Sequence, residues 1–269
     1  LRARLPEAQL LAGATDLGLL ASRHRHPPEA LIHVAHVPEL GVLVETDEEI
    51  TLGAAVTYAE ALPLLVRHFP ALGPYLTRIG SRQVRALGTL GGNIGTASPI
   101  GDSPPVLIAL ETRLTLVSAR GARSLPLEDF FLGYRKTALA PDEIIQSLTL
   151  PKLWPGEVFH CDKLSKRRDQ DISTVAAGYR LRLKNGQFED VRIGFGGMAA
   201  TPRRAVAIES ALREGGFAAA IAAVEQEFKP IDDWRGTAAY RLESARNLLR
   251  RLQLRIEAPG TAIDLEVLQ

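Results

Sequence analysis

The hydrophobic positions near the start of the chain form short runs, and their spacing indicates strands joined to helices by tight turns. Residues 9–12 are predicted to form a short strand, which the turn Gly13–Ala14–Thr15 ends. Asp16 then begins an apolar stretch at 17–21, the pattern of a helix start with an acidic residue at its positive end. This segment therefore predicts a strand–turn–helix unit.

Helical periodicity appears next at residues 58–69, where Leu62, Leu65 and Val66 fall on one face. Thr57 stands in the N-cap position and Glu60 follows three residues later, which is the capping-box pattern. Strands are also predicted at 33–36, 49–53, 113–118 and 144–150.

Residues 80–105 interrupt this alternation with Gly, Ser, Thr, Pro and Asn, a composition typical of loops that bend tightly or approach a ligand closely. Residues 151–155 carry two prolines and a tryptophan and are the best candidate linker.

The pattern changes after this linker. Strands are predicted at 173–183 and 190–195, joined through an Asn185–Gly186 hairpin turn, and helices at 205–212, 218–228 and 238–254. The expected fold class is α+β. We expect a domain at 1–152, in two subdomains split near 50–55, and a smaller domain of sheet plus helices at 156–269.

Composition and charge narrow the function. The chain has 269 residues and a formal charge of +1, which gives no reason to expect nucleic acid or an anionic membrane as partner. Apolar runs are too short to span a bilayer, no export leader opens the chain, and a cytoplasmic protein is expected. The single cysteine, Cys161, excludes an iron–sulfur cluster ligated by this chain. No initiator Met is present, so we interpret the chain as a piece of a longer polypeptide or a trimmed subunit.

Three segments carry candidate chemistry. LLAGATDL at 10–17 places a glycine turn between a strand and a helix start, where backbone N–H groups can bind an anion. GTLGGNIGTASPIGD at 88–102 has adjacent glycines whose backbone can close on a phosphate or a ring edge. DKLSKRRDQDI at 162–172 is a run of mixed charge. Each alone also fits an ordinary connection or a solvated loop.

In order along the chain, these segments resemble the FAD domain of xanthine dehydrogenases and related molybdopterin-dependent hydroxylases, followed by their C-terminal flavoprotein domain. YRKT at 134–137, PDEI at 141–144 and GFGGM at 194–198 extend the resemblance over nearly the whole chain.

The resemblance implies that the chain holds FAD. It implies that residues 10–17 cradle the pyrophosphate and adenosine end, that residues 89–93 wrap the cofactor, and that Asp102 hydrogen-bonds its polar middle. It also implies apolar residues at Ile79 and Ile145 on the two ring faces and a lysine, Lys163, near the flavin. We expect no catalytic residue and no metal ligand here. The implied cofactor-binding residues are Leu10, Leu11, Ala12, Gly13, Ala14, Thr15, Asp16, Leu17, Ile79, Thr89, Leu90, Gly91, Gly92, Asn93, Asp102, Ile145 and Lys163.

Two positions depart from the animal members of the family. Ile79 stands where those enzymes have an aromatic residue, and Gln170 stands where they have an acidic one. The first departure concerns ring stacking. The second lies in a loop that helps to decide between NAD and dioxygen as the electron acceptor.

The resemblance also implies the wider reaction. A xanthine dehydrogenase converts xanthine, NAD and water to urate and NADH, with iron–sulfur clusters in a domain preceding this one and molybdopterin in another subunit. Rival interpretations are the medium FAD subunit of a carbon monoxide dehydrogenase or other molybdenum hydroxylase, the reductase that completes UDP-N-acetylmuramate, and a scaffold without flavin. The 95–105 loop and the YRKT motif argue against the reductase.

Overall fold

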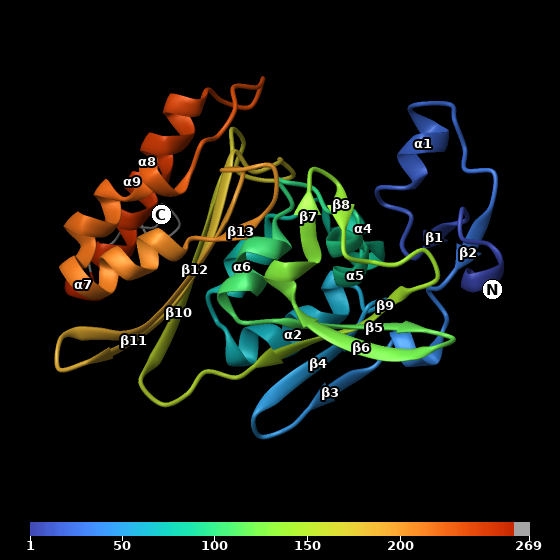
Figure 1. The fold of residues 1–269 in the computed structure, drawn as a ribbon, viewed down its shortest axis with the longest axis horizontal. Helices are drawn as coiled ribbons and strands as arrows, with labels where there is room; N and C mark the ends of the chain where they lie inside the picture. The colour runs from blue at the N-terminus through green and yellow to red at the C-terminus, as the bar shows by residue number, and fades with distance from the viewer. Residues whose placement is uncertain (261–269) are drawn as a thin grey trace.

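The computed structural model describes residues 1–260. Its chain begins with a small β–α–β unit, at the blue end of the ribbon in Figure 1. Strand β1 (Gln9–Leu11) pairs in parallel with β2 (Leu31–His33), and the short helix α1 (Gly18–Ser22) lies between them in sequence. Two 3₁₀ turns, Arg2–Arg4 and Pro38–Leu40, flank this unit.

A five-stranded antiparallel sheet follows, in the order β3-β4-β9-β5-β6. Its apolar side chains, among them Ile50, Leu114 and Leu148, join the core with helix residues such as Leu65 and Leu90. The strands are β3 (Leu43–Glu45), β4 (Glu49–Gly53), β5 (Arg113–Ser118), β6 (Gly121–Pro126) and β9 (Ile144–Pro151). The helices are α2 (Tyr58–His68), α3 (Leu72–Thr77), α4 (Arg82–Leu87), α5 (Leu90–Gly95) and α6 (Ser103–Ala109). A 3₁₀ turn (Leu127–Phe130) and the hairpin β7 (Phe131–Gly133) and β8 (Lys136–Thr137) precede β9.

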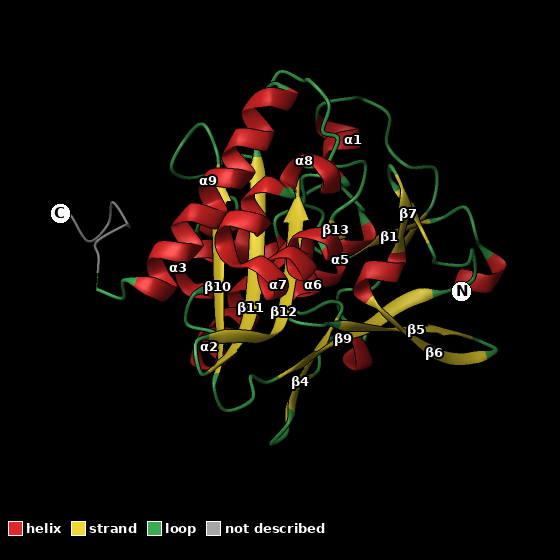
Figure 2. Ribbon diagram, turned by 60° about the vertical axis from the view of Figure 1, so that its left-hand side comes forward, coloured by secondary structure: helices red, strands yellow, loops and turns green. Residues whose placement is uncertain are grey.

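A second antiparallel sheet has the order β10-β11-β12-β13. Its strands are β10 (Glu157–Leu164), β11 (Val175–Lys184), β12 (Gln187–Gly196) and β13 (Arg203–Arg204). Helices α7 (Val206–Ala222), α8 (Val224–Glu227) and α9 (Ala238–Glu257) cover one face, as Figure 2 shows. Side chains on that face, including Tyr179, Ile193 and Phe195, form a second core with the helices. We call this sheet and its helices the second domain, and everything before β10 the first domain.

Helix α6 of the first domain lies against the opposite face of the second sheet, and glycines make this close approach feasible. A methyl group on Gly194 would lie 2.1 Å from the carbonyl oxygen of Pro105, and one on Gly178 would lie 2.7 Å from Cα of Val106. Because strand side chains alternate between faces, the apolar residues next to these glycines on β11 and β12 point to the helices α7 and α9 instead. These two glycines therefore allow α6 of the first domain to pack closely against the sheet of the second domain.

Several local predictions are confirmed. Strands 49–53 and 113–118 have the predicted bounds. The capping box of α2 forms, since Thr57 accepts from the N–H of Glu60 while the Glu60 carboxylate accepts from the N–H of Thr57. The hairpin turn between β11 and β12 has positive φ at Asn185 (53°) and Gly186 (77°), the geometry of a type I′ turn.

Other local predictions are wrong. The glycine-rich segment 80–105 is not one continuous loop, since α4, α5 and the start of α6 lie in it and only the stretch 96–102 between α5 and α6 is a longer irregular connection. The strand expected at 33–36 is Leu31–His33, and α1 begins at Gly18 rather than at Asp16. Strand β10, directly after the expected linker, was not predicted at all. None of the helices among residues 1–260 is long and apolar enough to cross a membrane.

Candidate functional site

Residues 12–17 form a turn that is exposed at 14–16 and partly buried at its ends, and its backbone donors are available. Ala14 has a positive φ of 59°. Within the described residues, no protein acceptor takes the backbone N–H groups of residues 13–17, whereas the N–H of Gly18 donates to Ala14. Unsatisfied amides gathered in one turn are suited to an anion such as a pyrophosphate.

Gly13 sets how this turn sits on the first domain. A methyl group on Gly13 would lie 1.6 Å from the carbonyl oxygen of Leu87, and one on Gly88 would lie 3.3 Å from Oγ1 of Thr15. The 10–17 segment therefore lies directly beside the start of the 88–102 segment, although more than 70 residues separate them. Leu10 and Leu11 lie in β1, partly buried, and Leu17 caps α1.

The two adjacent glycines of α5 differ from each other in their surroundings. Gly91 is buried, and a methyl group on it would lie 2.5 Å from the carbonyl oxygen of Ala54. Gly92 is exposed, and within 4 Å such a methyl group would meet only Oγ1 of Thr89, at 2.8 Å. Gly92 thus presents bare backbone on the surface of the helix.

The amides of α5 do not behave as expected. The N–H of Leu90 donates to Val56, that of Gly91 to Ala54, and that of Gly92 to Oγ1 of the N-cap Thr89. These donors are therefore not free to close on a phosphate. The expectation that these amides bind a phosphate is therefore corrected, because the amides attach the start of the helix to the rest of the domain. What α5 offers a ligand is a surface without side chains at Gly92.

Asn93 carries a buried acceptor that lacks a partner. Its Oδ1 is shielded from solvent and has no hydrogen-bond partner among the described residues. Leaving such a group unsatisfied costs about 1–3 kcal/mol. The oxygen lies beside Gly101, since a methyl group there would be 3.5 Å from it. A donor from a bound group would satisfy this oxygen.

Asp102, Lys163 and Ser173 form a network that we call the lysine network. Nζ of Lys163 donates to Oδ2 of Asp102 (2.7 Å) and to Oγ of Ser173 (3.0 Å), and Oγ of Ser173 donates to Oδ1 of Asp102 (2.5 Å). The Lys163 side chain is fully buried. Asp102 is the N-cap of α6, whereas Lys163 belongs to β10. The network therefore joins the two domains beside Gly101 and Asn93.

Ile79 and Ile145 are both buried, at 9% and 8% exposure. Ile145 on β9 lies near α5, since a methyl group on Gly95 would be 3.7 Å from its Cδ1. Ile79 lies in the turn after α3. Placement of these two side chains on opposite faces of one ring stays a prediction.

Sequence reasoning missed residues that hold these positions. Nη1 of Arg85 donates to the carbonyl oxygens of Thr77, Ile79 and Gly80, which fixes the Ile79 turn. Arg78 donates to the carbonyl oxygens of Lys163 and Arg168 and to the hydroxyl of Ser165. Ser173 of the lysine network was also missed. No motif marks these three residues, and the partners of Arg78 and Ser173 are distant in sequence.

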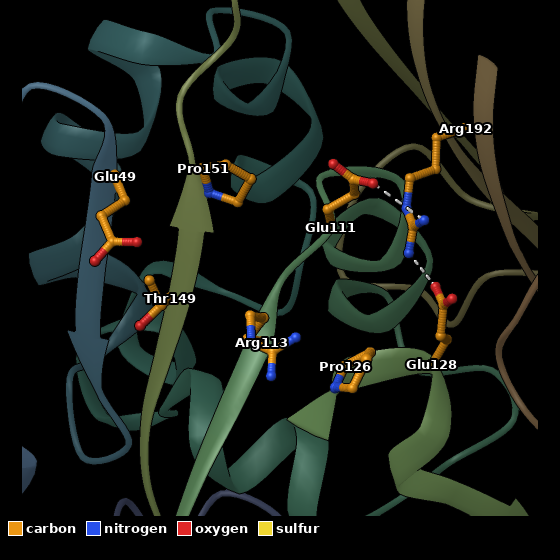
Figure 3. Close-up of a pocket in the computed structure, with 8 residues that line it drawn as sticks. All are labelled: Glu49, Glu111, Arg113, Pro126, Glu128, Thr149, Pro151 and Arg192. Carbon is orange, nitrogen blue, oxygen red and sulfur yellow. Dashed lines mark hydrogen bonds and ion pairs between the residues drawn. The ribbon is translucent and has the colours of Figure 1, made fainter. Parts of the chain in front are cut away.

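A hollow of about 370 Å³ is lined by other residues. Figure 3 shows Glu111, Arg192 and Glu128 beside it, paired through the Arg192 guanidinium, and Arg113 on β5 at the same hollow. No sequence-predicted site residue lines it; the lining residues are Glu49, Glu111, Arg113, Pro126, Glu128, Thr149, Pro151 and Arg192.

The chain is similar to xanthine dehydrogenases and to a carbon monoxide dehydrogenase. The chicken xanthine dehydrogenase/oxidase is 34% identical over 215 residues, covering 75% of this chain but 16% of that protein. The chain therefore spans about a sixth of the length of such relatives. A xanthine dehydrogenase FAD-binding subunit of Escherichia coli is 29% identical over 92% of this chain and 88% of its own length. A carbon monoxide dehydrogenase structure from Hydrogenophaga pseudoflava matches with a TM-score of 0.87 and 29% identity, covering 93% of this chain and 90% of that one.

Two family models match the chain. Residues 161–256 match the C-terminal domain of the carbon monoxide dehydrogenase flavoprotein. Residues 1–153, more than half of the chain, match the FAD-binding domain of molybdopterin dehydrogenases. The chain therefore belongs to the family of FAD-binding modules of molybdenum hydroxylases.

Proposed function

We propose that this chain binds FAD across its first domain and passes electrons from iron–sulfur clusters to NAD in a hydroxylase of the xanthine dehydrogenase type. The observation that carries the proposal is the run of unpartnered amides at 13–17, which packs against Leu87 and Gly88 at the end of α4, just before α5. A dinucleotide cofactor has a pyrophosphate for such donors.

The proposed site continues through residues of α5 and the start of α6. The bare backbone at Gly92 allows close approach, Asn93 Oδ1 awaits a donor, and Asp102 lies beyond Gly101. The proposed site thus uses residues 10–17, 89–93, Asp102 and Lys163, with Ile79 and Ile145 at the ring. The division into domains at 1–152 and 156–269, with a split near 50–55, is proposed with it, although residues 261–269 lie outside the described part.

The chain's own residues would bind and orient the cofactor. FAD, when bound, supplies a centre that takes up electrons singly and gives them up in pairs. Buried Ile79 and Ile145 would exclude water from the ring. The positive charge of Lys163 is shared with Asp102, so its influence on the cofactor is smaller than that of an unpaired ammonium.

The other components of the reaction lie outside this chain in the proposal. One cysteine cannot ligate an iron–sulfur cluster, so electrons would enter from a partner domain, preceding this one in the same polypeptide. Molybdopterin would reside in a further subunit, where xanthine is oxidised to urate. The cytoplasm, where NAD is the available acceptor, is the proposed location.

A second candidate is the medium FAD subunit of a carbon monoxide dehydrogenase-like enzyme. The structural match at a TM-score of 0.87, over 90% of a protein of that type, favours it. Mass analysis of the partners that copurify with the native chain would separate the candidates, because the molybdenum subunit determines the substrate.

A pair of assays on the purified, FAD-loaded chain tests the proposal. We expect NADH-dependent reduction of a dye and no xanthine-dependent reduction, because hydride transfer needs only the flavin and a route for nicotinamide. Xanthine turnover by this chain alone would overturn the proposal. Failure of both assays with FAD bound would reject NAD as the acceptor for the isolated module.

A further inference from the structure

We propose that helix α9 positions the lysine network through two of its arginines, Arg255 and Arg241, although it is not part of the network. The inference rests on the proposed FAD site, because the network is the part of that site which the second domain supplies. Lys163 and Ser173 are its two contributions.

The first anchor is next to Lys163 on β10. The guanidinium of Arg255 donates to both carboxylate oxygens of Asp162, at 2.8 and 2.9 Å, and Arg251 adds an ion pair at 3.3 Å. The Asp162 side chain is only 6% exposed. Neighbouring strand residues point to opposite faces, so Asp162 fixes the strand from the α9 side while Lys163 extends toward α6.

The second anchor is next to Ser173. Nη1 of Arg241 donates to the carbonyl oxygens of Thr174 (2.5 Å) and Gly197 (2.9 Å), and Nη2 pairs with Asp233 at 2.7 Å. Arg241 is 2% exposed. Gly197 has a φ of 80°, and a methyl group there would lie 2.3 Å from the oxygen of Thr174. The backbone at this anchor therefore has little freedom to shift.

The two anchors belong to one rigid element. Arg241 and Arg255 lie in the same uninterrupted helix, and each binds a residue that is next in sequence to a member of the network. A helix fixes the distance between its own residues, so α9 fixes the separation of the segments that carry Lys163 and Ser173. Contacts of 2.5 to 3.0 Å within the network tolerate little displacement.

Arg255→Met and Asp162→Asn test the inference in two independent ways. In the cofactor-free chain, we expect an amine-directed reagent to label Lys163 about tenfold faster, which corresponds to local opening easier by about 1.4 kcal/mol. In the FAD-loaded chain, we expect the midpoint potential of the flavin to shift in the same direction as in Lys163→Met. Labelling is quantified by mass spectrometry of the Lys163 peptide.

Matched variants separate positioning from stability. Arg250→Met removes an exposed arginine of α9 that pairs with Glu243 and Asn247 on the same helix, and it should leave both readouts unchanged. Arg255→Lys keeps the charge but loses the two parallel hydrogen bonds of the guanidinium. Its labelling rate and flavin potential should lie between those of the unaltered chain and Arg255→Met. If Asp162→Asn does not fold, the Arg255 variants still test whether α9 positions the lysine network.

Lower melting temperatures with wild-type labelling and wild-type potential would overturn the inference and leave α9 a purely structural role. Absence of FAD binding by the unaltered chain would instead reject the proposed function, because the labelling of Lys163 needs no cofactor. The two failures are therefore distinguishable.

Discussion

Gly92 is the residue at which the proposed cofactor surface can be tested with least disturbance of the fold. It is exposed, and a side chain there would meet only the hydroxyl of Thr89 within 4 Å. We predict that Gly92→Val lowers FAD affinity at least about tenfold, since two methyl groups would occupy the approach surface, while unfolding becomes easier by only about 1 kcal/mol through the weakened cap. Flavin fluorescence titration and melting of the cofactor-free chain measure the two effects. Full flavin retention would contradict the assignment.

Glu143 gives the chain a specific acid sensitivity. The Arg123 guanidinium, bonded at 2.6 and 2.8 Å, together with the N–H of Ala140, lowers the pKa of this carboxyl to about 2. A depressed folded-state pKa contributes stability above about pH 4.5, and this contribution is lost as the pH falls toward about 2.

We predict a contribution on the order of 1 kcal/mol, because the half-exposed Arg123 is screened by water. Denaturant unfolding between pH 2 and 6 measures it. Glu143→Gln should flatten the pH dependence in that window; an unchanged slope would exclude Glu143 as its source.

The residues of the candidate site divide by whether a local motif marks them. Gly13, Gly92 and Asp102 could be named as candidates because they lie in local motifs that match a known family. Ser173 and Arg78 could not be named, because no motif marks them and their contacts span about 70 to 90 positions. Sequence patterns carry propensity and periodicity, whereas these contacts arise only when the two domains pack.

At the level of elements, the glycine-rich segment shows why composition misled. Residues 90–95 form a helix despite three glycines because Thr89 caps it and because its first amides donate to Val56 and Ala54 of the preceding segment. Tertiary contacts thus outweighed the weak helix propensity. Strand β10 was missed because its charged residues are buried in ion pairs, which a hydrophobic pattern does not reveal.

The close contact between α6 and β12 leaves no space for a side chain at Gly194. A methyl group on Gly194 would overlap the carbonyl oxygen of Pro105, and a backbone atom cannot move aside cheaply. We predict that Gly194→Ala destabilises the chain by about 1–3 kcal/mol. Gly41→Ala is the matched control, since its nearest neighbour would be 3.7 Å away. Equal melting temperatures for the two variants would disprove the tight contact.

For the whole molecule, α6 is held to the second domain at both ends. The lysine network lies at its start, and beyond its end Glu111 pairs with Arg180 (2.7 Å) and Arg192 (3.2 Å) of the second sheet. Arg192 also pairs with Glu128 of the first domain. With glycines between the two ends, this arrangement fixes one orientation of the domains and brings Lys163 to Asp102.

Titration of the cofactor-free chain with FAD, followed by flavin fluorescence and compared with FMN, tests the central claim most directly. The account predicts saturation at one FAD per chain and much weaker binding of FMN, because FMN lacks the pyrophosphate and adenosine that residues 10–17 are proposed to hold. FMN binding as tight as that of FAD, or no saturable binding of FAD, would contradict the account.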